Sequence, residues 1–239
     1  MSIQLDGSAG AGLSTTPPDL RRATRLLAAV LIPVGPAAVA VLRYVLPYET
    51  NDSTAGAVAA IRAHPGTQSA VVWLGLVAIL TLVPGVIWIG RLTRRRAPRL
   101  TAVALVLLVP GYLSLSLLVG TDAALYFAAE HGLSPRVMGQ MYDGLHPVLA
   151  VGAALFVLGH VLGTILLGLA LWHSRTVPAW AAVVVIAAQP IHFVAAVIVG
   201  SHTLDLVGWG LNAVGFAVAA AAVLRTRDDD WDLGPVPRS

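Results

Sequence analysis

The sequence predicts an all-α protein, a polytopic bundle of six membrane-spanning helices with both termini in the cytoplasm. The first observation behind this prediction is composition: 57% of the 239 residues are hydrophobic and only 11% are charged. The mean hydropathy of +0.80 exceeds what a soluble core can bury, so the surrounding solvent has to be lipid. The second and third observations are six separate apolar stretches and a strong asymmetry of arginine between their ends.

The apolar stretches define the spans. A hydrocarbon core of about 30 Å requires roughly 20 apolar residues of helix. Six stretches meet this requirement, at 25–46, 69–90, 99–120, 147–171, 179–200 and 206–224. The chain then divides into a cytoplasmic tail, a six-helix domain and a second cytoplasmic tail, at 1–24, 25–224 and 225–239. Both tails have little apolar content, and we expect them to be disordered.

The first span has a competing interpretation. Arg21-Arg22, the apolar stretch that follows and Ala38-Val39-Ala40 resemble the three zones of a cleavable secretory signal. Cleavage there would leave five spans and an N-terminus outside. Apolar sequence continues to Leu46, which favours a first span that is retained.

The arginines set the direction of the spans. All 15 cationic residues are Arg, and they lie in short clusters beside the apolar stretches. Twelve flank or follow one set of helix ends, whereas three belong to the other set, namely Arg43, Arg62 and Arg136. Because cytoplasmic loops are enriched in Lys and Arg, the side with twelve is predicted to be cytoplasmic, in a plasma membrane. Clusters of this kind indicate topology, so no nucleic-acid partner is predicted.

Two loops on the predicted outer side are long enough to carry short helices. In the first loop, Ser53 or Thr54 caps a helix that runs through Ala63. In the second, Ser134-Pro135 combines an N-cap with a helix-opening proline, and Gly144 marks the end of the segment. We expect both helices to lie over the outer surface.

The hairpin of the second and third spans resembles the hairpin of the fourth and fifth at an offset of 80 residues. The matching pairs are Pro98 with Pro178, Pro110 with Pro190, and Gly120 with Gly200. Both copies run in the same direction. The pattern therefore predicts a parallel repeat, unlike the inverted repeats of many secondary transporters.

Two prolines near the middle of spans predict kinks that open space between helices. Pro110 and Pro190 each remove a backbone donor and bend the helix. Polar side chains lie beside them or at a similar depth, namely Tyr112, Gln189, His192 and Asn212. They predict an outward-facing polar pocket, with simple interhelical hydrogen bonding as the alternative.

Acidic residues gather on the predicted outer side, next to this apolar interior. A carboxyl group partly withdrawn from water has a raised pKa and can donate a proton near neutral pH. The candidate donors are Asp122 and Asp205, with Glu130 third. The predicted substrate-binding residues are Tyr112, Tyr126, His146, Gln189, His192, Trp209 and Asn212. A pair between Arg43 and either Asp122 or Asp205 would disarm that residue as an acid.

These residues predict an intramembrane enzyme that uses an acid to isomerise or cyclise a lipophilic, isoprenoid-like small molecule. The two short outer helices would act as a lid. A non-catalytic lipid-binding, immunity or transport-accessory membrane protein is the alternative, since it needs the same pocket without any proton transfer. The oligomeric state is not indicated by the sequence.

Redox and metal roles have less support. His160 and His192 leave open a haem protein with two axial imidazoles. His146, His202, Asp122 and Asp205 have metal-binding chemistry but no recognised spacing, so neither a metal nor a cofactor is predicted. The chain has no Cys, which excludes disulfides and thiolate sites.

The second half of the chain also carries a family resemblance. The run from Leu171 to Trp180, with Leu206–Gly210 and Ala213–Ala217, resembles a broad family of uncharacterised six-helix membrane proteins of actinobacteria. That resemblance implies a fold and no activity. In size and architecture the chain is also similar to small integral-membrane terpene cyclases of meroterpenoid pathways, which use membrane-embedded carboxylates as acids. No residue role is carried over from that second likeness.

Overall fold

The computed structural model describes residues 18–233, and this part of the chain is all-α. Six helices are long and apolar enough to cross a membrane: α1 (Arg21–Val45), α3 (Pro65–Thr93), α4 (Pro98–Glu130), α6 (Val148–Ser174), α7 with its extension η1 (Ala179–Val199) and α8 (His202–Arg225). They correspond to the six predicted spans and indicate a multi-pass membrane protein. The predicted disorder at residues 1–17 and 234–239 lies outside the described residues.

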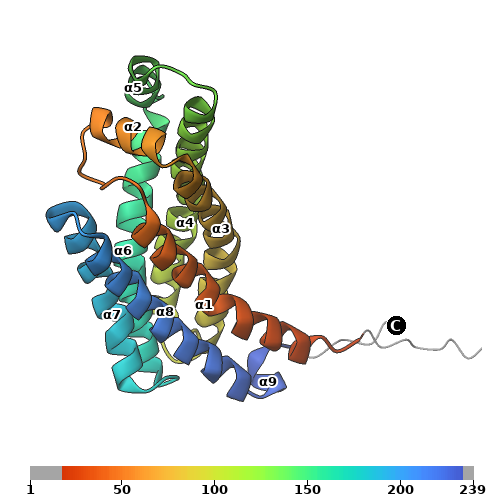
Figure 1. Cartoon of the computed structure of the whole chain (residues 1–239). Coiled ribbons are helices and arrows are strands. Elements are labelled where there is room, and N and C mark those ends of the chain that lie inside the picture. Colours follow the sequence, from red (N-terminus) through yellow and green to blue (C-terminus); the bar gives the residue numbers. More distant parts are fainter. Residues whose placement is uncertain (1–17, 234–239) are drawn as a thin grey trace, which may run out of the picture.

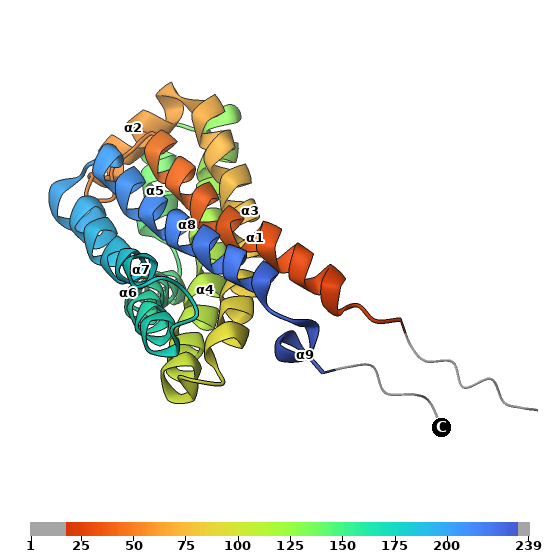
Figure 2. The same ribbon diagram turned by 90° about the horizontal axis from the view of Figure 1, so that it is seen from below.

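The six long helices form a ring in chain order. Each helix packs against the one before it and the one after it, and α1 closes the ring by lying between α8 and α3 (Figures 1 and 2). Ala38, Val39 and Ala40, the segment that resembles a cleavage site, are buried in the core of the ring. The first span is therefore one wall of the folded bundle.

The outer faces of the ring are apolar. Large apolar side chains on the long helices, such as Leu80, Val106 and Ile198, are more than 60% exposed. The inner faces carry a second apolar cluster, built around Leu82, Leu108 and Phe216. A helix that is apolar on both faces fits a lipid environment rather than water.

Small residues allow the helices to approach closely. An added Cβ at Gly159 of α6 would lie 2.9 Å from the Cα of Gly111 in α4 and 2.7 Å from the oxygen of Leu107. Such contacts are typical of membrane helices, where packing replaces the hydrophobic driving force between them.

Two short helices cover one end of the ring, which we call the α2–α5 end (Figure 1). In α2 (Thr54–Ala63) the Ser53 side chain accepts the amide of Gly56, and in α5 (Pro135–Asp143) Ser134 accepts the amide of Val137. Both caps and both helices are confirmed as predicted. That this end faces outward stays a prediction.

Two spans differ from the prediction. Helix α4 continues ten residues beyond the predicted end at residue 120, because Leu125 and Ala128 pack under α2 and α5. Helix α7 (Ala179–Phe193) changes into the π-helix η1 (Val194–Val199), which ends at Gly200 with a left-handed φ of 66°. This change follows Pro190, whose ring lacks a donor and disturbs the preceding turn.

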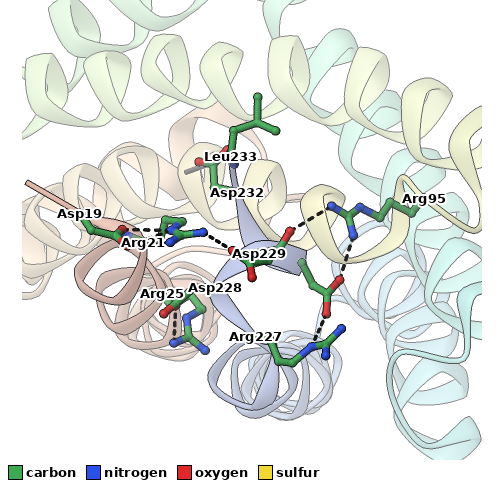
Figure 3. Close-up of polar contacts among 10 residues, drawn as sticks. Asp19, Arg21, Arg25, Arg95, Arg227, Asp228, Asp229, Asp232 and Leu233 are labelled. Carbon is green, nitrogen blue, oxygen red and sulfur yellow. Dashed lines mark hydrogen bonds and ion pairs between the residues drawn. The ribbon is translucent and has the colours of Figure 1, made fainter. Parts of the chain in front are cut away.

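The described part of the segment after α8 contains a short helix, within the region that the sequence predicts as a cytoplasmic tail from residue 225. Residues Asp228–Trp231 form α9 at the opposite end of the ring, which we call the α9 end (Figure 1). Trp231 is 1% exposed and donates to the hydroxyl of Thr24 at 3.1 Å. Four carboxylates surround it and pair with arginines of α1, α3 and the turn after α3, as Figure 3 shows in part: Arg21–Asp229, Arg25–Asp228, Arg91–Asp232 and Arg95–Asp230. A sequence of Asp and Arg is polar enough to suggest disorder, but the buried indole and the charge complementarity fix it here.

Candidate functional site

Polar side chains gather in two places in the half of the ring nearest the α2–α5 end. The first is the paired site around Asp205, in the first turn of α8. Asp205 is 1% exposed, and its Oδ2 accepts from Arg43 Nε of α1 at 2.5 Å. Its Oδ1 contacts Nδ1 of His192 from α7. Both oxygens therefore have cationic or N–H partners, and this geometry favours an ionised carboxylate.

Local sequence places these groups together. Ser201 caps α8 through the amide of Leu204 at 3.3 Å, which puts Asp205 near the positive end of the helix. Gly208 then lets α8 approach α7, since an added Cβ would lie 2.8 Å from the backbone nitrogen of His192. The π-helical segment begins directly after His192 and Phe193. π-Bulges inside helices are frequent at functional sites.

His192 has more partners than one nitrogen can serve. Nε1 of Trp209 lies 3.0 Å from His192 Nδ1, the same atom that contacts Asp205. A protonated Nδ1 donates to Asp205, whereas an unprotonated Nδ1 accepts from the indole, so the two hydrogen bonds exclude each other. The site therefore has two alternative arrangements of one proton.

His160 of α6 completes an aromatic cluster with these residues. Its ring centroid lies 5.2 Å from that of His192 and 5.6 Å from that of Trp209. His160 Nδ1 contacts the carbonyl oxygen of Phe156 at 2.5 Å. A carbonyl only accepts, so Nδ1 of His160 carries the proton and Nε2 is left with a lone pair.

A second polar layer lies one helical turn deeper. Gln189 is one turn before His192 on α7, and Asn212 is one turn after Trp209 on α8; both are fully buried. Neither amide has a hydrogen-bond partner among the described residues. At the same depth the hydroxyls of Tyr112 and Thr164 are 3.4 Å apart. Burying a polar group without a partner costs roughly 2–7 kcal/mol, so these amides call for a functional explanation.

The second place is the Asp122 site, on α4 beneath the two short helices. Asp122 Oδ1 accepts from the hydroxyl of Tyr48 at 2.6 Å and from Nε2 of Gln68 at 2.9 Å. Burial raises the pKa of Tyr48 well above its ordinary value, so the phenol keeps its proton and donates. Within residues 18–233 no arginine or histidine is paired with Asp122; the ion pairs at this end involve other carboxylates.

One loop connects the two sites. Residues 46–53, between α1 and α2, place Tyr48 on Asp122, Glu49 on His202 at 3.2 Å, and Thr50 on Arg43 at 2.7 Å. Gly200 faces this loop without a side chain, because an added Cβ would lie 3.0 Å from the amide of Asn51. The loop ties α4 to α8 across the α2–α5 end.

The remaining predicted site residues lie apart from both sites. Glu130 is exposed at the end of α4, and His146 is exposed and accepts the amide of Val148 at 3.2 Å. Tyr126 is partly buried one turn beyond Asp122. Tyr48 and Gln68, which the sequence does not single out, hold Asp122 instead. A tyrosine in a loop and a glutamine at a helix start carry no pattern that predicts this role.

The alternative metal and haem sites gain no support from this geometry. The four residues weighed for a metal take separate partners, and within residues 18–233 no three His, Asp or Glu side chains come together as a metal site. For the haem, a macrocycle between His160 and His192 would need the space where the two imidazoles and Trp209 already contact one another.

Comparisons of the chain with known protein families, with curated proteins and with solved structures find no match. What is shown is a bundle of six helices long and apolar enough to span a membrane, with one buried carboxylate, Asp205, and one partly buried carboxylate, Asp122, near one end.

Proposed function

We propose that this integral membrane protein is an acid-type isomerase or cyclase for a lipophilic, isoprenoid-like substrate, with Asp122 as the proton donor. One observation carries the proposal. Asp122 is partly buried next to an apolar cluster and is held by two neutral donors rather than by a cation. A carboxyl group in such surroundings is suited to holding and donating a proton.

The other two candidate donors are less suitable. Asp205 pairs with Arg43 and His192, so protonating it would break both contacts. Glu130 is exposed to solvent at the end of α4 and has no apolar surroundings in which to retain a proton. The role predicted for three carboxylates is therefore proposed for Asp122 alone.

The proposed step conserves atoms. The O–H bond of Asp122 breaks as its proton adds to one carbon of a C=C bond, which leaves a carbocation on the neighbouring carbon. The cation either loses a proton from an adjacent carbon directly, giving an isomer, or first bonds to a second C=C and then loses the proton, giving a ring. The carboxylate takes the proton back, so substrate and product have the same composition and no co-reactant is required.

The surroundings of Asp122 suit a cationic intermediate. Tyr48 and Tyr142 pack against one apolar cluster with Val58 of α2 and Leu125 of α4. Tyrosine faces stabilise a nearby cation. Of the predicted substrate contacts, Tyr126 lies one turn from Asp122 and is kept in this proposal, whereas His146 lies apart.

Helices α2 and α5 are proposed as the lid of this site. Thr54 of α2 donates to Asp143 of α5 at 2.8 Å, so the two helices are connected. Between them lies a cleft of about 480 Å³, lined by Ala55, Val58, Ala59, Arg62, Pro135 and Arg136. Val58 borders both this cleft and the cluster over Asp122, which makes the cleft the proposed entrance.

The test uses purified protein in lipid nanodiscs, incubated in D₂O with isoprenoid-bearing lipids and analysed by mass spectrometry. The wild type is expected to give an isomer that carries deuterium at the protonated carbon. Asp122→Asn should lose this product by roughly 100-fold or more, since it removes the acid. Asp52→Asn, the same change at an exposed carboxylate of the connecting loop, is the matched control and should keep the activity.

A non-catalytic lipid-binding protein is the second candidate. The ion pair of Arg43 with Asp205 favours it, because the more deeply buried of the two carboxylates is thereby committed to holding α1 against α8. Recovery of the same unaltered lipid from wild type and Asp122→Asn would overturn the enzyme and leave this binding role.

A further inference from the structure

The interior of the ring carries chemistry that the Asp122 proposal does not use. Five polar residues follow one another inward from the paired site: Asp205, His192, His160, Gln189 and Asn212. We call them the polar column. All five are buried, with exposed fractions of 8% or less.

Glycine contacts fix the order of the layers. Gly208 faces the backbone of His192, and Gly215, two turns further along α8, faces Val185 of α7. This antiparallel register places Asn212 beside the level of Gln189. The histidine layer therefore lies toward the α2–α5 end, and the amide layer lies one turn deeper.

The column contains buried hydrogen-bond donors and acceptors that have no partner among the described residues. Nε2 of His160, both polar atoms of Gln189 and both polar atoms of Asn212 are buried without a partner among the described residues. The His160 nitrogen is an acceptor, because its Nδ1 already donates to Phe156. A partner for this set must both donate and accept, and water is the smallest molecule that does so.

The column is open at one end only. At the α2–α5 end, the side chains of Arg43 and His192 are 15% and 10% exposed. Beyond the amide layer, toward the α9 end, the interior is filled by Leu167, Val185 and Phe216, which are 0% exposed. The path thus enters the ring and ends inside it.

We propose that the polar column is a proton path that leads from the α2–α5 surface at Asp205 through His192 to a buried proton-binding site at His160. A proton that enters from the surface makes His192 an imidazolium, held at Nδ1 by the Asp205 carboxylate. The Nε2 proton of His192 then passes to the lone pair on Nε2 of His160, directly or through one water, and His192 returns to its neutral form. Water bound at Gln189 and Asn212 solvates the new charge.

The charged groups around His160 suit this role. His192 faces it from α7, Asp205 belongs to the same cluster from α8, Arg43 pairs with Asp205 from α1, and α4 contributes the Tyr112 phenol at the level of Thr164. Helix α3 contributes no charged side chain between Pro65 and Gly90. Arg43 and Asp205 compensate each other, so the pair adds no net charge that would repel an incoming proton.

The path is tested by solvent exchange of the proton on Nε2 of His160, because the proton on Nδ1 is held by the carbonyl of Phe156 and does not travel along the path. The exchange is measured by NMR of ¹⁵N-histidine-labelled protein in lipid nanodiscs after transfer from acidic H₂O to acidic D₂O, and His160→Gln assigns the signal. In the wild type the Nε2 proton of His160 should exchange with solvent, and in His192→Phe this exchange should be lost. His173, which is exposed near the α9 end, should exchange equally in both and serves as the internal control.

A second variant covers the case in which His192→Phe does not fold. Gln189→Leu with Asn212→Leu replaces the unpartnered amides by apolar groups of similar size, which proteins tolerate when both polar groups are removed. This double variant should keep the fold and slow the exchange at His160. An Nε2 proton of His160 that never exchanges in the wild type, or exchange that is unchanged when the column residues are replaced, would overturn the proton path. Both readouts are independent of catalysis at Asp122.

Discussion

Asp122 and Asp205 are the same residue type in the same half of the ring, and their surroundings give them opposite properties. Asp205 has a guanidinium and an imidazole on its two oxygens. Asp122 has a phenol and an amide, both neutral. The first arrangement stabilises a negative charge, and the second permits a proton. The comparison teaches that the partners of an intramembrane carboxylate, more than its depth, decide what chemistry it can do.

The largest expected difference between the two sites is in stability. Asp205→Ala leaves Arg43, whose side chain is mostly buried, without its carboxylate partner and should lower the free energy of unfolding by about 3–5 kcal/mol. Asp122→Ala leaves only neutral donors unsatisfied and should cost about 1–3 kcal/mol. Unfolding of the purified protein in mixed micelles with increasing SDS measures both.

The double variant Arg43→Met with Asp205→Leu separates the lost pair from the stranded charge. Replacing both partners of a buried ion pair by apolar residues is often neutral or stabilising, so the double variant should recover most of the loss. Equal losses for Asp205→Ala and Asp122→Ala would show that the ion pair does not distinguish the sites.

The close approach of α8 to His192 gives the second effect. Gly208→Ala adds a Cβ 2.8 Å from the backbone nitrogen of His192, and overpacking of this kind costs about 1–3 kcal/mol. Gly210→Ala, on the same helix, has open space around its Cβ and should gain about 0.5–1 kcal/mol from helix propensity. SDS unfolding of the two variants compares them. If Gly208→Ala is as stable as Gly210→Ala, α8 does not approach His192 as described.

Most of the fold could be predicted from the sequence, because lipid imposes length and composition on every span. The caps at Ser53 and Ser134 could also be predicted, because a cap depends on residues adjacent in the sequence. The extension of α4 could not be predicted. It depends on contacts of Leu125 and Ala128 with helices that follow or precede α4 by many residues.

The sequence predicts several of the residues at the two sites, but it does not predict which residue each of them pairs with. The sequence shows that Arg43 is able to reach Asp122 or Asp205, but only the ring places α1 beside α8 and thereby selects Asp205. Tyr48 and Gln68 contact Asp122 from a loop and from another helix, and no spacing along the chain relates the three. The short helix that ends at Trp231 could not be predicted, because its stabilising contacts also come from α1 and α3.

Removal of one neutral donor from Asp122 is the third, smaller effect. Tyr48→Phe deletes the hydrogen bond from the phenol and should cost about 1 kcal/mol, the net value of one such bond. Tyr44→Phe, at an exposed position of α1, is the matched control and should be neutral. SDS unfolding measures both. A larger loss than that of Asp205→Ala would reverse the ranking of the two sites.

The smallest effect is expected at the α9 end, where ion pairs of the same residue types lie near water. A hydrogen bond and the charge of Arg227 hold the pKa of Asp230 below its ordinary value. The stabilisation from Asp230 is therefore complete above the ordinary Asp pKa and is lost as the pH falls through the lowered one. Fluorescence of Trp231 should shift to the red as α9 releases in acid, and added salt should promote the same release, because exposed pairs are screened.

Single-tryptophan protein is needed for that measurement, with the other five indoles replaced by Phe. Asp230→Asn should reduce the dependence of the Trp231 red shift on acid pH. Over the range of salt that releases α9, the ion pair of Asp205 should keep α1 on α8, because this pair is buried. An α9 end that resists salt as well as the paired site does would mean that Trp231, more than the four ion pairs around it, holds α9 in place. Asp122 and Asp205 alone would then show how the partners of a carboxylate change its properties.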